Sequence, residues 1–370
     1  MTIRILHIIG SLKLGGAQVS VKYLTENADD GKFEIFVYPL RSRDIDIPIR
    51  GNVIKLPYRN YDPRKFLTIL RLCKKYHIDI IHAHLEKPIL GSLLAGYFCK
   101  VRVIVHERGP VFRKGIKASI YRFLLRLLHH RASLIIANSN ATADCLIDKI
   151  KINPNRIRVI YNAVDLENFA PDRQARRRIR NQLAIEPRDI VIGFVGRLHP
   201  VKGVDLLIEA VSSLLKKSPR YLLLMLGEGP QHRFLEALAE RLGIADRVRF
   251  LGFRENVSEI MNVFDIGVIP SRQEPFGIVA LEYMSMKIPL VCSAADGLAE
   301  LVSNEETALV PADNTPKEIA HSIERLAGNR ELRRKLTDAA SRYCENFSVP
   351  KHIEAIENIY IELLNNNERI

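Results

Sequence analysis

The chain has 370 residues, of which 47% are hydrophobic and 26% charged, as in an ordinary soluble globular protein. A chain of this length exceeds what one hydrophobic core usually holds, so we expect two domains. No apolar run reaches the ~18 residues that suggest a membrane-spanning helix, so no membrane span is predicted.

The net charge of +13 is unevenly distributed along the chain. Residues 1–168 carry 28 Lys+Arg against 14 Asp+Glu, whereas residues 169–370 carry 27 against 28. This asymmetry indicates a polyanionic partner for the first half, either nucleic acid or an anionic membrane face. The basic residues are not interleaved with aromatic residues and form no nucleic-acid-binding motif, so we prefer the membrane.

The five cysteines are widely spaced and show neither a disulfide nor a metal-binding pattern, which fits a reducing cytoplasm. The apolar run over residues 3–9 is too short for a signal peptide and predicts a first buried strand. Gly15-Gly16 follows in a loop before a helical pattern. Such a loop lets a phosphate or sugar approach the backbone, although a Gly-Gly pair is more often a simple turn.

Alternating patterns then continue to residue 161. We expect strands over 33–38, 53–56, 78–83, 102–106, 133–137 and 157–161, and helices over 63–76, 88–99, 112–134 and 141–150. This alternation predicts a parallel sheet with helices on both faces, whose ligands gather at the carboxyl ends of the strands.

Histidines end two of these strands. His82 and His84 end one, and His106 ends the next, followed by Glu107 and Arg108. No carboxylate pattern joins the histidines, so we predict no metal site there. We favour a substrate contact for His106, with a hydrogen-bonded structural histidine as the alternative.

The helix expected over 112–134 is basic and amphipathic. Its apolar positions are Ile116, Ile120, Phe123, Leu124 and Leu127, and six basic residues lie among them. An ordinary surface helix packs such a stripe on the sheet, which is the more common case. Insertion into a membrane is the alternative.

A polar and very basic segment follows the last strand of this domain. We therefore predict an N-terminal domain over 1–168, a linker or hinge over 169–184, and a C-terminal domain over 185–348. The last helix, 349–370, is expected to pack back on the first domain.

The second domain begins with a strand over 189–195, whose following loop presents Arg197 and Lys202 beside two glycines. Two cations and small residues at a strand end form a suitable cradle for a diphosphate. Two cations on a solvated loop are, however, usually without function.

The segment 271–282 is the most informative part of the chain. A buried strand ends at Pro270, and a helical pattern from Gly277 places Phe276 and Gly277 at a helix start, where unpaired amides favour an anion. Glu274 precedes this start and Glu282 lies about two turns into the helix, so both carboxylates can face one cleft. A carboxylate accepts two hydrogen bonds from a sugar diol. The alternative is a dipole-stabilising Glu274 and a solvated Glu282.

Several motifs, taken together and in order, resemble the retaining glycosyltransferases of the GT-B fold, specifically glycosyltransferase family 4. They are Gly15-Gly16-Ala17-Gln18, His106, Ser139-Asn140-Ala141, Val159 to Asp165 with Phe169, Gly196-Arg197 with Lys202-Gly203, Leu226 to Pro230, Phe250-Leu251-Gly252, and Glu274 to Glu282 as the E-x7-E motif. The resemblance implies two Rossmann-like, doubly wound parallel-sheet domains facing a central cleft.

The resemblance also implies roles for particular residues. Arg197 and Lys202 hold the donor diphosphate, Glu282 the ribose, and Glu274 a donor-sugar hydroxyl, while His106 approaches the sugar from the acceptor domain. The remaining donor contacts come from backbone and loop positions: Gly16, Gly227, Leu251, Phe253, Phe276, Gly277, Ile278 and Val279. Arg197, Lys202 and helix amides can stabilise the leaving diphosphate without a metal.

Asp44 and Asp46 form the Asp-x-Asp pattern of metal-dependent glycosyltransferases of the other fold. They lie in a polar connection, so we interpret them as a solvated loop and expect no metal cofactor. Because Glu274 is not obviously a nucleophile, a front-face substitution with retention is expected rather than a double displacement.

The leading hypothesis is therefore a cytoplasmic, membrane-peripheral transferase. It moves a hexose or N-acetylhexosamine from a nucleotide sugar to a cell-envelope glycan or lipid-linked acceptor. We expect the donor to be UDP-linked. The alternatives are the same fold acting on a soluble acceptor, and a non-catalytic subunit that binds sugar nucleotides. A nucleic-acid binder has only the basic charge in its favour.

Overall fold

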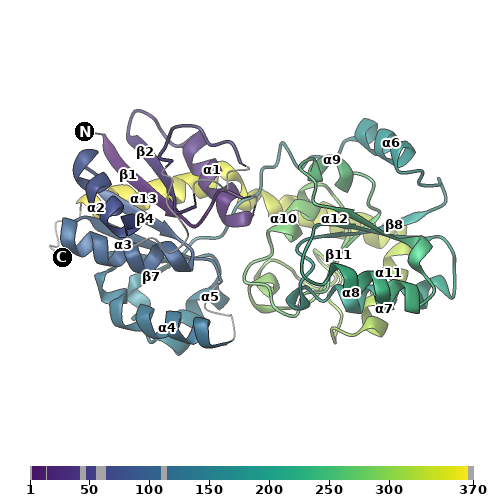
Figure 1. Cartoon of the computed structure of the whole chain (residues 1–370). Helices are drawn as coiled ribbons and strands as arrows, with labels where there is room; N and C mark the ends of the chain where they lie inside the picture. The colour runs from purple at the N-terminus through teal and green to yellow at the C-terminus, as the bar shows by residue number, and fades with distance from the viewer. Residues whose placement is uncertain (1, 14, 42–46, 56–63, 110–114, 366–370) are drawn as a thin grey trace. The chain divides into compact units, whose positions relative to one another are not determined.

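The structure is a computed structural model in which residues 2–13, 15–41, 47–55, 64–109 and 115–365 are described (Figure 1). They group into two compact units. The N-terminal unit comprises residues 1–163 with 349–370, and the C-terminal unit comprises residues 164–348. Each unit is a parallel sheet with helices on both faces.

The sheet of the N-terminal unit has the order β3-β2-β1-β4-β5-β6-β7, and all its pairings are parallel. Its strands are β1 (Ile3–Ile9), β2 (Phe33–Pro39), β3 (Asn52–Val53), β4 (Ile80–His84), β5 (Arg102–Glu107), β6 (Leu134–Ala137) and β7 (Ile157–Val159). Its helices are α1 (Gly16–Asn27), α2 (Arg64–Lys75), α3 (Glu86–Cys99), α4 (Ile116–Leu128), α5 (Asn140–Cys145) and α13 (Val349–Asn365).

Alternate residues of each strand serve the two faces of this sheet. Leu6 and Ile8 of β1 belong to the core cluster that includes Tyr121 and Leu125 of α4. Ile5 points to the other face and joins the cluster that contains Ile356 of α13. The last helix of the chain therefore completes the core of the N-terminal unit, and Figure 1 shows it beside α1 and the first strands.

The C-terminal unit has a parallel sheet of order β10-β9-β8-β11-β12. Its strands are β8 (Ile190–Val195), β9 (Tyr221–Leu226), β10 (Val248–Gly252), β11 (Ile266–Ile269) and β12 (Leu290–Cys292). Its helices are α6 (Arg173–Gln182), α7 (Val204–Leu215), α8 (His232–Arg241), α9 (Val257–Met261), α10 (Ile278–Ser285), α11 (Pro316–Gly328) and α12 (Arg330–Cys344). The α/β prediction with two doubly wound parallel sheets is confirmed.

Two strand glycines leave room for aromatic rings that pack on this sheet. A Cβ at Gly267 would come within 2.9 Å of the Tyr283 ring, and one at Gly193 within 2.0 Å of the Phe264 ring. The hydroxyl of the fully buried Tyr283 donates to the carbonyl oxygen of Gly193 at 3.0 Å. The missing side chain of Gly267 and the hydrogen bond to Gly193 thus position α10, the helix of the E-x7-E motif, against β8 and β11.

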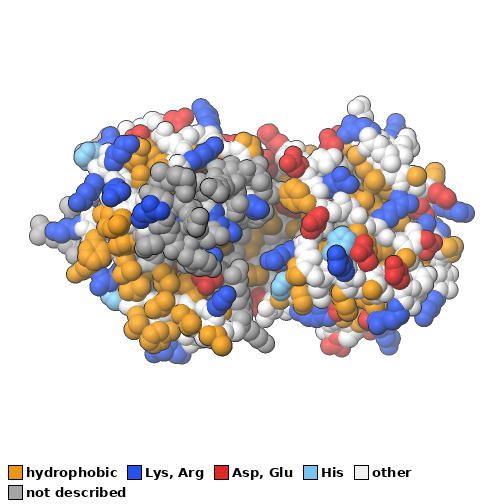
Figure 2. All heavy atoms as spheres, in the orientation of Figure 1, with side chains coloured by type: hydrophobic (Ala, Val, Ile, Leu, Met, Phe, Trp, Pro, Cys, Tyr) orange, Lys and Arg blue, Asp and Glu red, His pale blue; other side chains and the backbone are white. Residues whose placement is uncertain are grey.

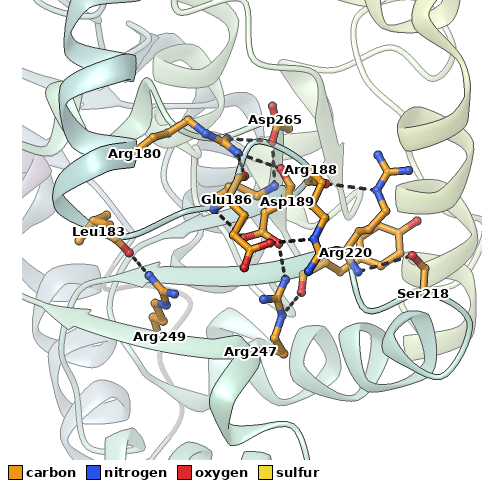
Figure 3. Close-up of polar contacts among 12 residues, drawn as sticks. Arg180, Leu183, Glu186, Arg188, Asp189, Ser218, Arg220, Arg247, Arg249 and Asp265 are labelled. Carbon is orange, nitrogen blue, oxygen red and sulfur yellow. Dashed lines mark hydrogen bonds and ion pairs between the residues drawn. The ribbon is translucent and has the colours of Figure 1, made fainter.

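The segment predicted as a linker is part of the C-terminal unit. Asp172 caps α6 by accepting hydrogen bonds from the amides of Gln174 and Ala175. Arg176 then donates to Asp265 Oδ1 at 2.6 Å. Figure 3 shows the network beyond this helix, in which Arg180 donates to the carbonyl oxygens of Glu186 and Asp189. The basic residues that suggested a solvated linker are therefore partly used to hold α6 in place.

The helix predicted over 112–134 is shorter, and its apolar stripe does not face the sheet. Residues 110–114 lie outside the described residues, and α4 covers Ile116–Leu128. Its buried residues are Ala118, Tyr121 and Leu125. Ile116 and Phe123 are 81% and 61% exposed. The more common interpretation, with the stripe on the sheet, is wrong because the small and aromatic side chains of the opposite side fill that space.

In the described part of the chain, no helix is both long and apolar enough to cross a membrane. None of the five cysteines, all of which lie in the described part of the chain, forms a disulfide.

Candidate functional site

The strand order of the C-terminal sheet reverses between β8 and β11, which are neighbours in the sheet although α7, β9, α8, β10 and α9 lie between them in the chain. Ligands of doubly wound sheets bind outside the carboxyl ends of the strands at such a switch point. Two loops leave the sheet there: residues 196–203 after β8, and residues 270–277 after β11. They carry Arg197, Lys202 and Glu274, the residues that the sequence singles out.

Lys202 and Glu274 meet between these two loops. The Lys202 ammonium donates to Glu274 Oε2 at 2.5 Å, and the Ser271 hydroxyl donates to the same oxygen at 3.2 Å. The backbone amide of Glu274 donates to Asp296 Oδ2 at 3.0 Å, which fixes the loop from the other side. The side chain of Glu274 is only 12% exposed. Within the described residues no donor bonds Glu274 Oε1, so this oxygen can accept a hydroxyl.

Backbone contacts hold the surrounding loops together. The amide of Leu198 donates to the Glu228 carbonyl oxygen at 3.0 Å, and that of Gly227 to the Gly252 carbonyl oxygen at 2.8 Å. Gly227 has a φ of 132°, and a Cβ there would lie 2.0 Å from the Gly196 carbonyl oxygen. Glycine is required here because the loops after β8 and β9 touch backbone to backbone.

Gly277 turns the chain into α10 with a φ of 93°. The first amides of a helix have no partner inside it, so those of Ile278 and Val279 lie at the positive end of α10. Phe276 is 2% exposed and packs near Phe347, so its side chain belongs to the core and only its backbone is suited to a ligand. Helix α10 has eight residues, which limits its dipole to a supporting role.

Glu282 lies one turn into α10, not two, because the helix begins at Ile278 rather than near Glu274. Its side chain is partly buried, and burial raises its pKa to about 7. Within the described residues no group donates a hydrogen bond to its carboxylate. Glu274 lies before the helix, as expected, so the loop carries the first carboxylate and the helix carries the second. That both carboxylates face one cleft stays a prediction.

The remaining predicted donor residues of this unit lie on the same edge of the sheet. Arg197 is exposed directly after β8, and no described residue pairs with its guanidinium. Leu251 is partly buried at the end of β10, and Phe253 is 51% exposed just beyond it. Arg197 thus follows β8 at the switch point, whereas Leu251 and Phe253 lie two strands away at the end of β10.

The other predicted contacts belong to the N-terminal unit. Gly16 begins α1, and a Cβ there would meet no atom within 4 Å, so close packing does not explain this glycine. Gln18 donates to the Ser11 carbonyl oxygen at 3.2 Å, which gives its amide a structural role. Asp44 and Asp46 lie outside the described residues.

His106 is fully buried at the end of β5. Its Nδ1 lies 3.2 Å from His82 Nε2 and 3.3 Å from an Arg108 nitrogen. Its Nε2 has no hydrogen-bond partner among the described groups. Burial, followed by the charge of Arg108, lowers its pKa well below the usual value, so the imidazole is neutral and can accept or donate one hydrogen bond.

The N-terminal unit contains a histidine cluster that the sequence did not reveal in full. His7 of β1 joins His82 and His84, and their ligand atoms lie within 4.8 Å of one another. The register that pairs His7 with His82 shows how β1 and β4 bring them together. Burial lowers the pKa of all three. The Arg108 charge nearby disfavours a second cation, and His7 already bonds His84 at 2.9 Å, so a hydrogen-bonded core network is the better interpretation.

Taken together, these observations define a class: α/β proteins of two Rossmann-like units, with a cluster of polar and charged side chains at the switch point of the second sheet. Two family profiles match the chain. "Glycosyltransferase Family 4" matches residues 14–168, and "Glycosyl transferases group 1" matches residues 175–343.

Curated relatives agree with these matches. A D-inositol 3-phosphate glycosyltransferase from Corynebacterium jeikeium is 33% identical over 394 residues, covering 96% of this chain and 93% of that protein. The enzyme of the same name from Salinispora tropica is 32% identical over 246 residues, or 62% of this chain. In that second match the chain spans about half, 51%, of the relative's length.

Among solved structures, HepE from Anabaena in complex with UDP and glucose has a TM-score of 0.84, at 22% identity. The match covers 97% of this chain and 100% of that one, and at this identity it shows the fold alone. The chain thus has the GT-B fold and belongs to glycosyltransferase family 4, in the group 1 glycosyl transferases.

Proposed function

We propose that this protein transfers a hexose or N-acetylhexosamine from a UDP-linked sugar nucleotide, with retention of configuration and without a metal, to a cell-envelope glycan or lipid-linked acceptor such as lipopolysaccharide. The observation that carries the proposal is the meeting of Lys202 and Glu274 at the switch point, beside Arg197 and the amino end of α10. That HepE shares the fold and holds UDP and glucose supports a donor of this kind.

Each group has a chemical task in this proposal. Departure of a nucleoside diphosphate builds negative charge, which Arg197, Lys202 and the first amides of α10 stabilise. Lys202 has three N–H donors, so it can bind a phosphate oxygen while it keeps Glu274 in place. Glu274 accepts a hydroxyl of the donor sugar, and Glu282 accepts both hydroxyls of the ribose.

The N-terminal unit supplies the acceptor side of the proposal. His106 and Gly16 keep here the roles that membership of family 4 implies, His106 toward the reacting sugar and Gly16 toward the donor phosphate. Nε2 of His106 has no partner among the described groups, although the side chain is fully buried. We include an anionic membrane surface as a partner of this unit, because residues 1–168 carry twice as many cationic as acidic residues. The protein is then cytoplasmic and peripheral at the inner face of the plasma membrane.

A soluble acceptor is the second candidate. It is favoured by the name of the Corynebacterium relative, whose acceptor is an inositol phosphate and whose alignment spans nearly the whole chain. Transfer assays that offer inositol phosphates, disaccharides and extracted lipid-linked glycans, with analysis of the labelled product, separate the two acceptor classes.

Donor binding is tested by thermal stabilisation against UDP, ADP, GDP and their sugar conjugates, each with and without a chelator. We expect stabilisation by one base, insensitive to the chelator, of about 2.7 kcal/mol when the ligand is at a hundred times its dissociation constant. The Glu282→Ala variant should lose this stabilisation by nucleotide. The matched control is Glu240→Ala, which removes an exposed glutamate of α8 and should keep the stabilisation.

Absence of stabilisation by every nucleotide would contradict the proposal. Binding without any turnover on either acceptor class would favour a non-catalytic sugar-nucleotide subunit instead. Loss of binding with the chelator would refute metal independence while leaving the rest intact.

A further inference from the structure

The N-terminal unit exposes a large apolar surface on three neighbouring helices. Of the ten large apolar side chains that are exposed in the described part of the chain, eight lie on α2, α3 and α4, namely Leu67, Leu94, Tyr97, Phe98, Ile116, Ile120, Phe123 and Leu127. Figure 2 shows orange side chains gathered over α3 and α4, with blue cations among them. Contiguous exposed patches of this kind mark interaction sites, whereas single exposed apolar residues are ordinary.

Helix α4 presents its apolar side away from the protein. Ile116, Ile120, Phe123 and Leu127 follow a spacing of four, three and four residues, so they form one stripe along the helix. At ~100° per residue, this stripe lies about 170° around the helix from the buried Ala118, Tyr121 and Leu125. The helix is therefore held by one side while the other offers four large apolar side chains to the outside.

Cations flank this stripe. By the same helical periodicity, the exposed Lys117 and Arg126 lie about 90° from the stripe on its two sides. Arg131 lies over the Tyr97 ring, with its guanidinium carbon 3.9 Å from the ring centroid. Long basic side chains beside an apolar stripe can reach lipid phosphates while the stripe enters the acyl region.

The charge of the whole segment selects the partner. Between Lys87 and Ala143 the sequence has one acidic residue, Glu107, and ten basic ones, namely Lys87, Lys100, Arg102, Arg108, Arg113, Lys114, Lys117, Arg122, Arg126 and Arg131. Glu107 is fully buried, where the Tyr121 hydroxyl donates to it at 2.6 Å, so it does not offset the surface charge. Arg108 is also directed inward, toward Asn162 and Ser20, so the surface excess comes from the other basic residues. Two copies of such a surface would repel each other, whereas an anionic bilayer complements it.

From this combination we propose that α4 and the adjoining end of α3 form a docking face for an anionic lipid bilayer, with Ile116, Ile120, Phe123 and Leu127 inserted among the lipids and α4 lying in the plane of the interface. This deepens the membrane part of the proposed function by assigning the face and the mode of contact. It also follows that electrostatic attraction alone does not hold the protein at the membrane.

The test is flotation of the full-length protein with vesicles of phosphatidylcholine alone or of equal parts phosphatidylcholine and phosphatidylglycerol, at low and high salt. We expect binding to the anionic vesicles that weakens with salt. Ile120→Ser with Phe123→Ser should reduce it at least tenfold even at low salt, because both side chains are exposed and the insertion is lost. Lys117→Gln with Arg126→Gln should lower only the preference for anionic lipid.

Phe234→Ser is the matched control, because Phe234 is 52% exposed but lies on α8 of the C-terminal unit; it should bind as the wild type does. Circular dichroism and thermal melting confirm that each variant is folded. Binding that the Ile120/Phe123 variant retains, or no binding to any vesicle, would overturn the proposal. So would a dimer in sedimentation that this variant dissociates, which would assign the face to a second copy.

The vesicle test does not use catalysis, so its failure is distinguishable from that of the glycosyl-transfer proposal. If a nucleotide raises the thermal stability of the protein but the protein does not bind vesicles, only the docking-face proposal is contradicted.

Discussion

At the scale of single residues, the two carboxylates near the switch point of the C-terminal sheet have different surroundings. Lys202 and Glu274 form a close pair in a loop environment that is mostly shielded from water. Glu282 is different, because burial raises its pKa and, among the residues that the structure describes, no cation pairs with it to stabilise the ionised form. A ligand that donates two hydroxyls to this carboxylate would supply the missing stabilisation.

This arrangement predicts a pH dependence for nucleotide binding. Because Glu282 has a pKa of about 7 in the folded protein, against an ordinary value of 4.5, it is largely protonated below neutrality. Only the ionised carboxylate accepts hydrogen bonds from both hydroxyls of the ribose. The affinity for the nucleotide should therefore be constant above about pH 7 and fall by up to tenfold per pH unit below it. Calorimetric titration with UDP across this range measures the effect, and Glu282→Gln should flatten the profile.

The same raised pKa makes the stability of the fold depend on pH in the opposite direction from the affinity. A carboxyl whose folded pKa is raised stays protonated in the folded state while the unfolded chain ionises, so folding is disfavoured as pH rises from about 4.5 to about 7. The difference in unfolding free energy between Glu282→Gln and the wild type should therefore favour the variant more at pH 8 than at pH 4. An affinity profile unaffected by the substitution would show that Glu282 does not contact the ligand.

At the scale of elements, α6 illustrates how hydrogen bonds convert a basic segment into structure. Asp265, at the start of β11, accepts from Arg176 of α6 at 2.6 Å and from the Val191 amide of β8 at 2.8 Å. One carboxylate thereby ties the helix to two neighbouring strands. The segment was predicted as a hinge because its charges suggest solvation, whereas partners distant in sequence decide where it lies.

Asp265→Ala tests this anchoring. It removes the acceptor of the Val191 amide and of one Arg176 nitrogen, while Arg176 keeps its bonds to the Asn262 and Phe264 carbonyl oxygens. An unpaired, partly buried donor costs about 1–3 kcal/mol. We expect a loss of stability of about 2–3 kcal/mol in urea unfolding of the C-terminal unit. Arg188→Ala, which removes the exposed pair with Glu186, is the control and should change stability by less than about 0.5 kcal/mol. Equal effects of the two substitutions would contradict the anchoring role.

Helix α4 makes the complementary point about elements. Its periodicity correctly indicates an amphipathic helix, but periodicity alone does not say which side faces the core. Ala118, Tyr121 and Leu125 pack inward, and the Tyr121 hydroxyl bonds the buried Glu107. A buried carboxyl that needs a donor helps to orient the helix, and it leaves the strongest apolar stripe outside.

At the scale of the whole molecule, the chain leaves the N-terminal unit at residue 163 and returns to it at residue 349. Helix α13 then supplies Ile353, Ile356 and Ile359 to one face of the first sheet. Its Tyr360 hydroxyl lies 2.7 Å from His82 Nδ1, which joins the helix to the histidine network. The stability of the N-terminal unit thus depends on residues that follow the C-terminal unit in sequence.

Ile356→Ala tests that dependence. The side chain is fully buried, so its truncation should destabilise the N-terminal unit by about 2–5 kcal/mol. Hydrogen exchange should then show lost protection in β1 and β4, with β8 and β9 unchanged. Glu354→Ala, on the exposed side of α13, is the control. Lost protection in β8 rather than β1 would contradict the assignment of α13 to the N-terminal unit.

Much of the fold was predictable because local patterns carry it. Alternating strand and helix periodicities correctly predict two parallel sheets, since such strands are apolar along their length and need helices on both faces. The motifs that resemble family 4 lie at strand ends, and the family membership is confirmed. The roles of Glu274, Glu282, Arg197, Lys202 and His106 stay predictions, because they depend on bound ligands.

By itself, the sequence determined the fold class, the family and the loops that carry the candidate site, because periodicity and short motifs are local properties. Only the tertiary structure decided that α6 belongs to the C-terminal unit, that His7 joins His82 and His84, and that the stripe of α4 faces outward. Each of these depends on contacts between residues far apart in the chain. Such contacts follow from how whole elements compete for the same core, which no local pattern records.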